Sequence, residues 1–217
     1  MSNFSGVIFD LDGTLVDSLP DIADAMNRTL RYFGYPVYSY EEYKYMVGSG
    51  LKNLVYKALP EDKKGDRYIN ETLLLMMREY GKSYADKTVL YEGIPELLDA
   101  LTLKGCKLSV LSNKADSLTQ KIVSALFTGR KFEVILGASE RFPRKPAPDA
   151  ALFIAERMNI PPGNILYTGD TNIDMQTANA AGMYAVGVSW GFRKREELEE
   201  SGAETIINHP MDLMELL

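Results

Sequence analysis

One short segment constrains the fold of this chain more than any other. The apolar run 7–9 is followed at once by Asp10, Leu11, Asp12 and Gly13. Such a run is typical of a buried strand, and alternation along a strand places Asp10 and Asp12 on the same side of the chain. Two carboxylates so close together repel each other unless a positive charge lies between them, and Mg²⁺, which prefers oxygen ligands, would supply it. By itself the pattern also fits an acidic turn after a strand, so the rest of the chain has to decide.

From about residue 88 onward, predicted strands and helices alternate. The predicted strands are 107–111, 132–136, 164–168, 183–188 and 205–207, with helices between them. This spacing is typical of repeated β-α-β units, which form a parallel sheet covered by helices on both faces. The first strand has the composition of the same sheet. The predicted fold class is therefore α/β, a doubly wound parallel sheet, with a core made of residues 1–17 and 88–217.

Residues 18–87 interrupt that core with helical patterns and no convincing strand. The predicted helices are 20–33, a short one from the cap at Ser39 toward Met46, then 51–59 and about 66–86, and Ser39 with Glu42 forms a capping-box pattern for the second of them. We interpret 18–87 as an inserted small helical cap domain. It follows the carboxyl end of the first strand, where open α/β sheets bind ligands, so it is placed to act as a lid that excludes water.

Composition excludes several classes of protein. A chain of 217 residues, 46% of them hydrophobic, fits one globular domain or a domain with an insert. The net charge of −6 gives no broad basic surface for nucleic acid. The single cysteine, Cys106, cannot form an intrachain disulfide and favours a reducing compartment. We recognise no signal peptide and no membrane-length apolar segment, so we expect a cytoplasmic protein without a membrane partner.

Polar residues follow three of the later predicted strands. In chain order they are Ser112 and Asn113, then Lys145, then Asp170 and Asp174. Taken singly, these are ordinary turn, helix-cap and surface residues. Together with Asp10 and Asp12 they place several carboxylates, a hydroxyl and a lysine along one edge of the sheet. That set matches phosphoryl transfer, which needs a metal, a nucleophile, an acid–base partner and a cationic clamp.

This set of motifs resembles the haloacid dehalogenase (HAD) superfamily in its phosphatase branch. Residues 10–18 look like the first family motif, Ser112–Asn113 the second, Lys145–Pro146 the third, and Gly169–Asp170 with Asp174 the fourth. The resemblance extends over essentially the whole chain, in the family's order and spacing, and the helical insert stands where the family has its cap. Within the family, the sequence pattern is most similar to that of the phosphoglycolate phosphatase-like members, so the resemblance implies a small phosphorylated metabolite as substrate.

The resemblance also implies a role for each matched residue. Asp10 would be the nucleophile that forms an aspartyl-phosphate, and Asp12 would be the general acid and base. Mg²⁺ is the implied cofactor, held by Asp10, the backbone carbonyl of Asp12 and Asp170, with Asp174 bound directly or through water. The expected substrate-binding residues are Thr14, Ser112, Asn113, Lys145, Gly48 and Gly50. The two glycines either offer N–H groups to a substrate carboxylate or form a plain turn between helices.

Alternatives stay open within and outside the family. A pyrophosphatase, a nucleotidase or a sugar-phosphate phosphatase would use the same core residues. A dehalogenase would not need Asp12, a phosphonate hydrolase would have alanine there, and a sugar-phosphate mutase would carry a cap histidine, whereas the only histidine is His209. A binding or regulatory protein that had lost turnover would keep the fold. Either a monomer or a homodimer is compatible with the sequence, and the charged run that begins at Arg193 is interpreted as a solvated helix surface.

Overall fold

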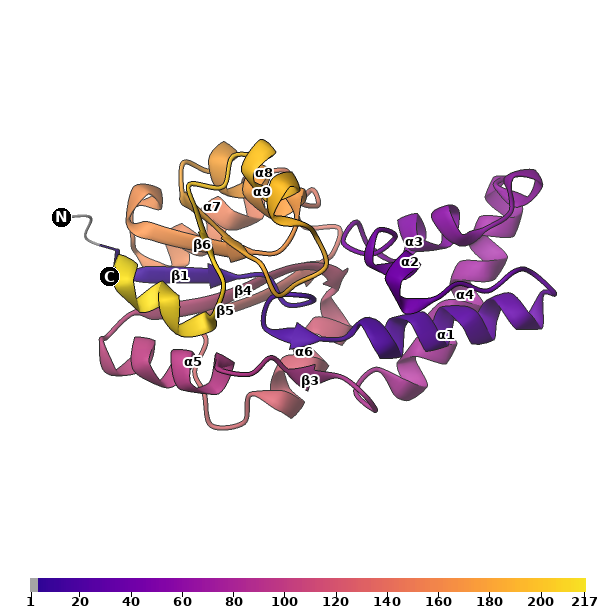
Figure 1. Cartoon of the computed structure of the whole chain (residues 1–217), viewed down its shortest axis with the longest axis horizontal. Coiled ribbons are helices and arrows are strands. Elements are labelled where there is room, and N and C mark those ends of the chain that lie inside the picture. Colours follow the sequence, from indigo (N-terminus) through magenta and orange to yellow (C-terminus); the bar gives the residue numbers. More distant parts are fainter. Residues whose placement is uncertain (1–3) are drawn as a thin grey trace.

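A six-stranded sheet forms the centre of the molecule in the computed structural model, which describes residues 4–217 (Figure 1). The strands lie in the order β5-β4-β1-β6-β7-β8. Their bounds are β1 Gly6–Phe9, β4 Lys107–Ala115, β5 Val134–Ala138, β6 Ile165–Gly169, β7 Tyr184–Val188 and β8 Thr205–Ile207. Every pair in this sheet is parallel, so all the carboxyl ends lie at one edge. The predicted doubly wound parallel α/β fold is confirmed.

Helices cover both faces of this sheet. One face carries α5 (Ile94–Leu103), α6 (Asp116–Leu126) and the 3₁₀ helix η3 (Pro210–Leu216). The other face carries α7 (Asp149–Met158), α8 (Asn172–Ala180) and α9 (Arg195–Glu200). A 3₁₀ turn, η2 (Pro162–Asn164), precedes β6. Strand alternation sends Val7 and Phe9 into the first layer of core and Ile8 into the second, and all three are fully buried. A strand buried on both faces is a continuous apolar run, which explains the pattern at the start of the chain.

The helical insert, residues 18–87, lies beyond the carboxyl ends of the strands, at the opposite end of the molecule from the C-terminus (Figure 1). Its helices are α1 (Leu19–Tyr32), α2 (Tyr40–Lys44), α3 (Leu51–Ala58), the 3₁₀ turn η1 (Glu61–Lys63) and α4 (Asp66–Ser83). They surround an apolar cluster of their own that includes Met26, Leu30, Tyr43, Leu54 and Met76. The predicted capping box at the start of α2 is present. None of the helices that the structure describes is long and apolar enough to cross a membrane.

Two differences from the prediction lie at the edge of the sheet. β4 runs on to Ala115, so the polar residues 112–114 lie within a strand rather than after it. Pairing with β5 is irregular between Leu111 and Ala115, and such a bulge turns these polar residues out of the regular ladder. A short antiparallel ribbon, β2 (Val16–Asp17) with β3 (Val89–Leu90), joins the two ends of the insert. Two residues per strand are too few to show a periodic pattern in the sequence.

Asp21 connects the two chain segments that link the insert to the core. It lies in the first turn of α1 and is 2% exposed. Its Oδ2 accepts hydrogen bonds from the backbone N–H of Lys87 at 2.9 Å, the backbone N–H of Thr88 at 2.8 Å and the Thr88 hydroxyl at 2.7 Å. One buried carboxylate therefore satisfies several donors of the returning segment and fixes where the insert leaves and rejoins the sheet.

We expect Asp21→Ala to lower the free energy of unfolding by about 2–4 kcal/mol, because it leaves buried N–H groups without an acceptor. The matched control is Asp24→Ala on the same helix, since Asp24 forms a partly exposed ion pair with Lys87 at 2.7 Å. That change should cost less than about 1 kcal/mol. Urea unfolding followed by circular dichroism measures both, and equal losses would contradict the assignment.

Candidate functional site

Asp10 lies at the carboxyl end of β1, the strand at which the order of the sheet reverses. β4 flanks β1 on one side and β6 flanks it on the other. Such a switch point leaves a crevice where open α/β sheets bind ligands. The backbone N–H of Asp10 donates to the carbonyl of Thr168 in β6 at 2.9 Å, which continues the ladder by one residue. The Asp10 side chain is thereby fixed at the centre of the sheet edge.

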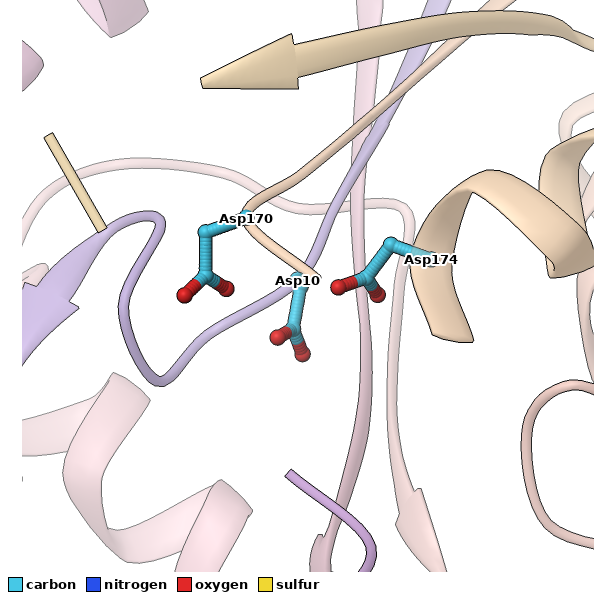
Figure 2. Close-up of side chains that lie close together, drawn as sticks. All are labelled: Asp10, Asp170 and Asp174. Atoms are coloured by element: carbon cyan, nitrogen blue, oxygen red, sulfur yellow. The ribbon is translucent and has the colours of Figure 1, made fainter. Parts of the chain in front are cut away.

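Three buried carboxylates meet at this point. Asp10 from β1, Asp170 after β6 and Asp174 in α8 each have an oxygen within 4.8 Å of the other two (Figure 2). Asp10 is 7% exposed, and the other two are fully buried. Gly13 makes this approach possible: its φ is +88°, and an added Cβ atom would lie 2.2 Å from Oδ2 of Asp170. The predicted convergence of these strand ends is therefore observed.

Neighbouring loops hold two of these carboxylates in place. The backbone N–H of Phe192 donates to Oδ2 of Asp170 at 2.8 Å, and the hydroxyl of Thr14 donates to its Oδ1 at 3.3 Å. Asp174 accepts from the backbone N–H and the hydroxyl of Thr171, at 3.1 Å and 2.6 Å, in the capping box that begins α8. Thr14 is completely buried, so in this structure its hydroxyl serves Asp170, and a substrate contact by Thr14 stays a prediction.

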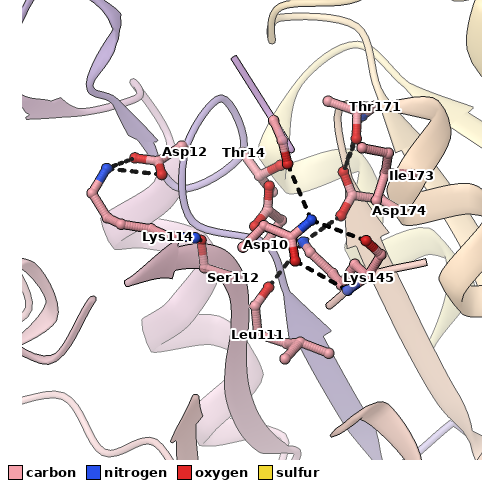
Figure 3. Close-up of polar contacts among 12 residues, drawn as sticks. Asp10, Asp12, Thr14, Leu111, Ser112, Lys114, Lys145, Thr171, Ile173 and Asp174 are labelled. Carbon is pink, nitrogen blue, oxygen red and sulfur yellow. Dashed lines mark hydrogen bonds and ion pairs between the residues drawn. The ribbon is translucent and has the colours of Figure 1, made fainter. Parts of the chain in front are cut away.

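Lys145 is the cation of the cluster. Its Nζ lies 2.9 Å from Oδ1 of Asp10 and 2.7 Å from Oδ1 of Asp174, and it donates to the carbonyl of Leu111 at 3.1 Å (Figure 3). Burial alone would lower the pKa of Lys145, but the two carboxylates raise it well above its usual value. Burial raises the pKa of Asp10 to about 7, against the opposing effect of Lys145. Burial and then the charges of Asp174 and Asp10 raise the pKa of Asp170 well above its usual range.

The carboxylate cluster fits a divalent metal ion. If all three carboxylates ionise, the cluster carries three negative charges, and the ammonium of Lys145 offsets one of them. Two negative charges then stay uncompensated. Oδ1 of Asp10 is buried and has its ion pair with Lys145 but no aligned hydrogen bond. Buried carboxylates at this spacing are a suitable ligand set for a hard cation, which takes oxygen ligands and would offset their repulsion.

Asp12 has a lysine of its own. Lys114 Nζ lies 2.7 Å from Oδ1 and 2.9 Å from Oδ2 of Asp12 (Figure 3). The Ser18 hydroxyl donates to the same carboxylate. In this structure the carboxylate of Asp12 lies outside the three-aspartate cluster, so a cation shared by the side chains of Asp10 and Asp12 stays a prediction. A metal contact through the Asp12 carbonyl stays a prediction.

Lys114 is the functional residue that sequence reasoning missed. It is 7% exposed, and its ammonium lies 5.0 Å from the ring centre of Tyr80 in α4 of the insert. Burial would lower the pKa of Lys114, but the contact with Asp12 raises it above its usual value. A signal was available: alternation along β4 places residue 114 on the same side as Ser112. It could be used only by extending the strand beyond Leu111.

Ser112 and Asn113 take up different positions. Ser112 lines the cavity next to Asp10, as expected for a residue that contacts substrate. Asn113 also lines the cavity, but its amide is bound to backbone: Nδ2 donates to the carbonyl of Gly48 at 3.2 Å and of Lys145 at 3.1 Å, and Oδ1 accepts from the Lys145 N–H at 3.0 Å. In this structure Asn113 therefore ties the insert and the loop that carries Lys145 to the strand.

A small cavity of about 40 Å³ lies between the sheet edge and the insert. Its core side carries Asp10, Asp12, Ser112 and Lys114, and its insert side is formed by Ile22, Val47, Leu51 and Leu54 with the turn glycines Gly48 and Gly50. Of the six predicted substrate-binding residues, four line this cavity: Gly48, Gly50, Ser112 and Asn113. Thr14 and Lys145 are not among its lining residues. The site thus combines charged groups on one wall with an apolar wall on the other.

Comparison with known proteins agrees with this geometry. The family model of the haloacid dehalogenase-like hydrolases matches residues 7–188, which include every residue of the site. The chain belongs to this family. A phosphoglycolate phosphatase of Pseudomonas savastanoi is 33% identical over 215 residues, covering 97% of this chain and 78% of the relative. That of Escherichia coli K12 is 32% identical over 231 residues, covering 98% and 92%. Within the HAD family, the chain is a phosphoric monoester hydrolase.

Solved structures show the same fold from end to end. The structure of a candidate phosphoglycolate phosphatase from Lactobacillus delbrueckii has a TM-score of 0.93 and 30% identity, with 99% of this chain and 98% of that chain covered. CbbY from Rhodobacter sphaeroides, crystallised with phosphate, has a TM-score of 0.81 at 21% identity, with 97% of this chain and 96% of that chain covered, which is a likeness of fold alone. The resemblance inferred from the motifs is confirmed.

We expect the affinity of the protein for Mg²⁺ to fall about tenfold per pH unit below pH 7. The Asp10 carboxyl has a pKa of about 7, so protons compete with the metal ion as the pH falls. Isothermal titration calorimetry between pH 6 and pH 8 measures this slope. Asp10→Asn removes one of the titrating groups of the cluster and should make the slope shallower, and an affinity that does not change with pH in the wild type would contradict the assignment.

Proposed function

We propose that the protein hydrolyses a small phosphomonoester, with 2-phosphoglycolate as the first candidate, in a Mg²⁺-dependent reaction through an aspartyl-phosphate on Asp10. The observation that carries the proposal is the buried cluster of Asp10, Asp170 and Asp174 around Lys145, opening onto a cavity that also holds Asp12. The names of the curated relatives support the substrate. A cytoplasmic location also stays a prediction.

Asp10 is the proposed nucleophile, because its carboxylate lines the cavity at the centre of the sheet edge. Attack on phosphorus forms an acyl phosphate and releases the alcohol, and water then hydrolyses that bond. Lys145 favours the ionised carboxylate, which is the attacking form, against the effect of burial. Mg²⁺, held by Asp10 and Asp170 with Asp174 beside them, would supply positive charge that reduces repulsion between the carboxylate and the phosphoryl group.

Asp12 is the proposed acid–base group. Its side chain is 17% exposed and reaches the same cavity as Asp10, whereas Lys114 and Ser18 fix its direction. The ion pair with Lys114 suits the second half of the reaction, in which an ionised carboxylate takes a proton from water. In the first half the same carboxyl group would give a proton to the leaving oxygen.

The walls of the cavity favour a small leaving group that carries one negative charge. Sugar hydroxyls would lie against Ile22, Leu51 and Leu54, where they would lose hydrogen bonds to water without replacement. Lys114 is the cation that lines the cavity, and it provides a partner for a carboxylate. The turn at Gly48 and Gly50 offers backbone groups on the facing side. Phosphoglycolate fits these conditions better than a nucleotide or a hexose phosphate does.

Asp10→Asn should abolish phosphate release, since the amide cannot attack phosphorus, while the fold stays intact. A loss of at least about 10³-fold in kcat is expected, by analogy with the removal of a nucleophile in other enzymes. Phosphate release in the presence of Mg²⁺ measures activity, and circular dichroism checks the fold. Glu156→Gln on the exposed side of α7 is a matched control that should change neither. Residual activity near that of the wild type would disprove the nucleophile assignment.

Asp12→Asn should slow both steps and let the phosphorylated enzyme persist, because no group then activates the hydrolytic water. Mass spectrometry after acid quench would detect one phosphoryl group on the peptide that contains Asp10. Rates within a few-fold of the wild type would rule out the acid–base role.

A panel of phosphomonoesters tests the substrate. With Mg²⁺ present, we expect kcat/KM to be at least about tenfold higher for 2-phosphoglycolate than for nucleotides, hexose phosphates or pyrophosphate, since unpaired buried polar groups cost at least 1 kcal/mol each. Chelation by EDTA should stop turnover, and added Mg²⁺ should restore it. A preference for another member of the panel would reassign the substrate. No release from any of them would favour a binding or regulatory protein.

A further inference from the structure

Arg193 is buried, although the sequence around it is typical of a solvated surface. It is 9% exposed and lies in the loop between β7 and α9. Its guanidinium donates to the carbonyl of Lys44 and, at 3.0 Å, to the carbonyl of Val47, both in the helical insert. It also lies 5.4 Å from the ring centre of Tyr45. The expectation of a solvated charge is therefore wrong for Arg193, because its partners are on another part of the chain.

An arginine suits this position for a geometric reason. α2 ends at Lys44, and the last carbonyls of a helix have no partner within the helix. The planar guanidinium carries several N–H donors at fixed angles, so it can satisfy the carbonyl of Lys44 and, beyond the end of the helix, that of Val47 at once. Glu197, one turn further on in α9, lies 3.2 Å from Nε and holds the side chain in that direction. The hydrogen bonds from Arg193 to the insert are thus directional, and the ion pair with Glu197 keeps the guanidinium oriented toward them.

The loop that carries Arg193 also contacts the candidate catalytic residues. We call residues 189–193 the bridging loop. Its Phe192 N–H donates to Asp170 at 2.8 Å, and Nε1 of Trp190 donates to the carbonyl of Thr14 at 3.1 Å. The ring of Phe192 lies in the apolar cluster of the insert. The bridging loop therefore binds the carboxylate site at one end and the insert at the other.

The segment that Arg193 holds forms one wall of the cavity. Val47 and Gly48 line the cavity, and Asn113 donates to the carbonyl of Gly48 at 3.2 Å. The cavity measures about 40 Å³ and Asp10 is only 7% exposed, so the position of this wall determines how much room a leaving group has. The contacts of Arg193 hold the wall in the position that the structure shows.

We propose that Arg193 is a positioning residue that holds residues 44–48 of the insert against the sheet edge and thereby selects small leaving groups. This rests on the proposed function, since it assumes that the cavity holds the leaving group of a phosphomonoester. When Arg193 is removed, the apolar wall is held less firmly, so a small substrate loses its enclosure. A bulky aryl phosphate fits this small cavity less well, so its turnover depends less on how closely the wall is held.

Arg193→Ala and Arg193→Lys test the proposal, with Arg195→Ala as the matched control. Arg195 forms the same kind of i,i+4 ion pair, with Glu199 at 2.7 Å, but its side chain faces solvent. Within residues 4–217, no hydrogen bond or ion pair joins Arg195 to the insert. For Arg193→Ala we expect the ratio of kcat/KM for 2-phosphoglycolate to that for p-nitrophenyl phosphate to fall at least about tenfold, the effect of losing hydrogen bonds to a charged group. Arg193→Lys should give an intermediate ratio, and Arg195→Ala a ratio within twofold of the wild type.

Limited trypsin digestion supplies a readout that needs no activity. Cleavage after Lys44 and Lys52, mapped by mass spectrometry, should be faster in Arg193→Ala than in the wild type and unchanged in Arg195→Ala. If activity toward both esters falls equally and cleavage is unchanged, Arg193 has only a general structural role and the proposal is wrong. A wild type inactive on every phosphomonoester overturns the proposed function instead, and the cleavage rates then still decide whether Arg193 holds the wall.

Discussion

Three buried carboxylates around a single lysine are the arrangement on which the rest of this site depends. Asp10, Asp170 and Asp174 lose hydration on burial, and Lys145 forms ion pairs with two of them, Asp10 and Asp174. Removing an ion from water costs several kcal/mol even after the protein relaxes. Backbone N–H groups of two neighbouring loops offset part of this cost. The part of this desolvation cost that is not offset favours binding of a further positive charge at the cluster.

Two aspartates of one short segment acquire different chemistry because their surroundings differ. Asp10 is enclosed among other acids at the end of β1, and its pKa is raised to about 7 by burial. Asp12, two residues on, has left the strand and forms a close ion pair with Lys114 at the cavity wall. Environment rather than residue type therefore separates the proposed nucleophile from the proposed acid–base group, as it does wherever paired carboxylates divide a reaction between them.

The sequence was sufficient for those features that depend on the sheet. The carboxyl ends of parallel strands meet at one edge, so the strand ends predict that Asp10 and Asp170 lie together, with Asp174 close by at the start of the helix that follows. The lysine partners were harder. Lys114 required knowing that β4 continues through a bulge, and Arg193 required knowing that a loop far along the chain reaches the insert. Neither fact follows from a local pattern, because both depend on contacts between segments remote in sequence.

Selection of the substrate cannot be assigned to the helical insert alone. The insert contributes the apolar wall at Leu51 and Leu54, but the cation that faces it, Lys114, belongs to β4 of the core. A cavity with both properties exists only while the two parts are in contact. The contacts that keep them together come from core residues that reach into the insert, through Arg193 and Asn113 onto backbone carbonyls. Backbone carbonyls are present whatever the side chains are, so the insert's side chains can change the shape of the cavity without loss of these contacts.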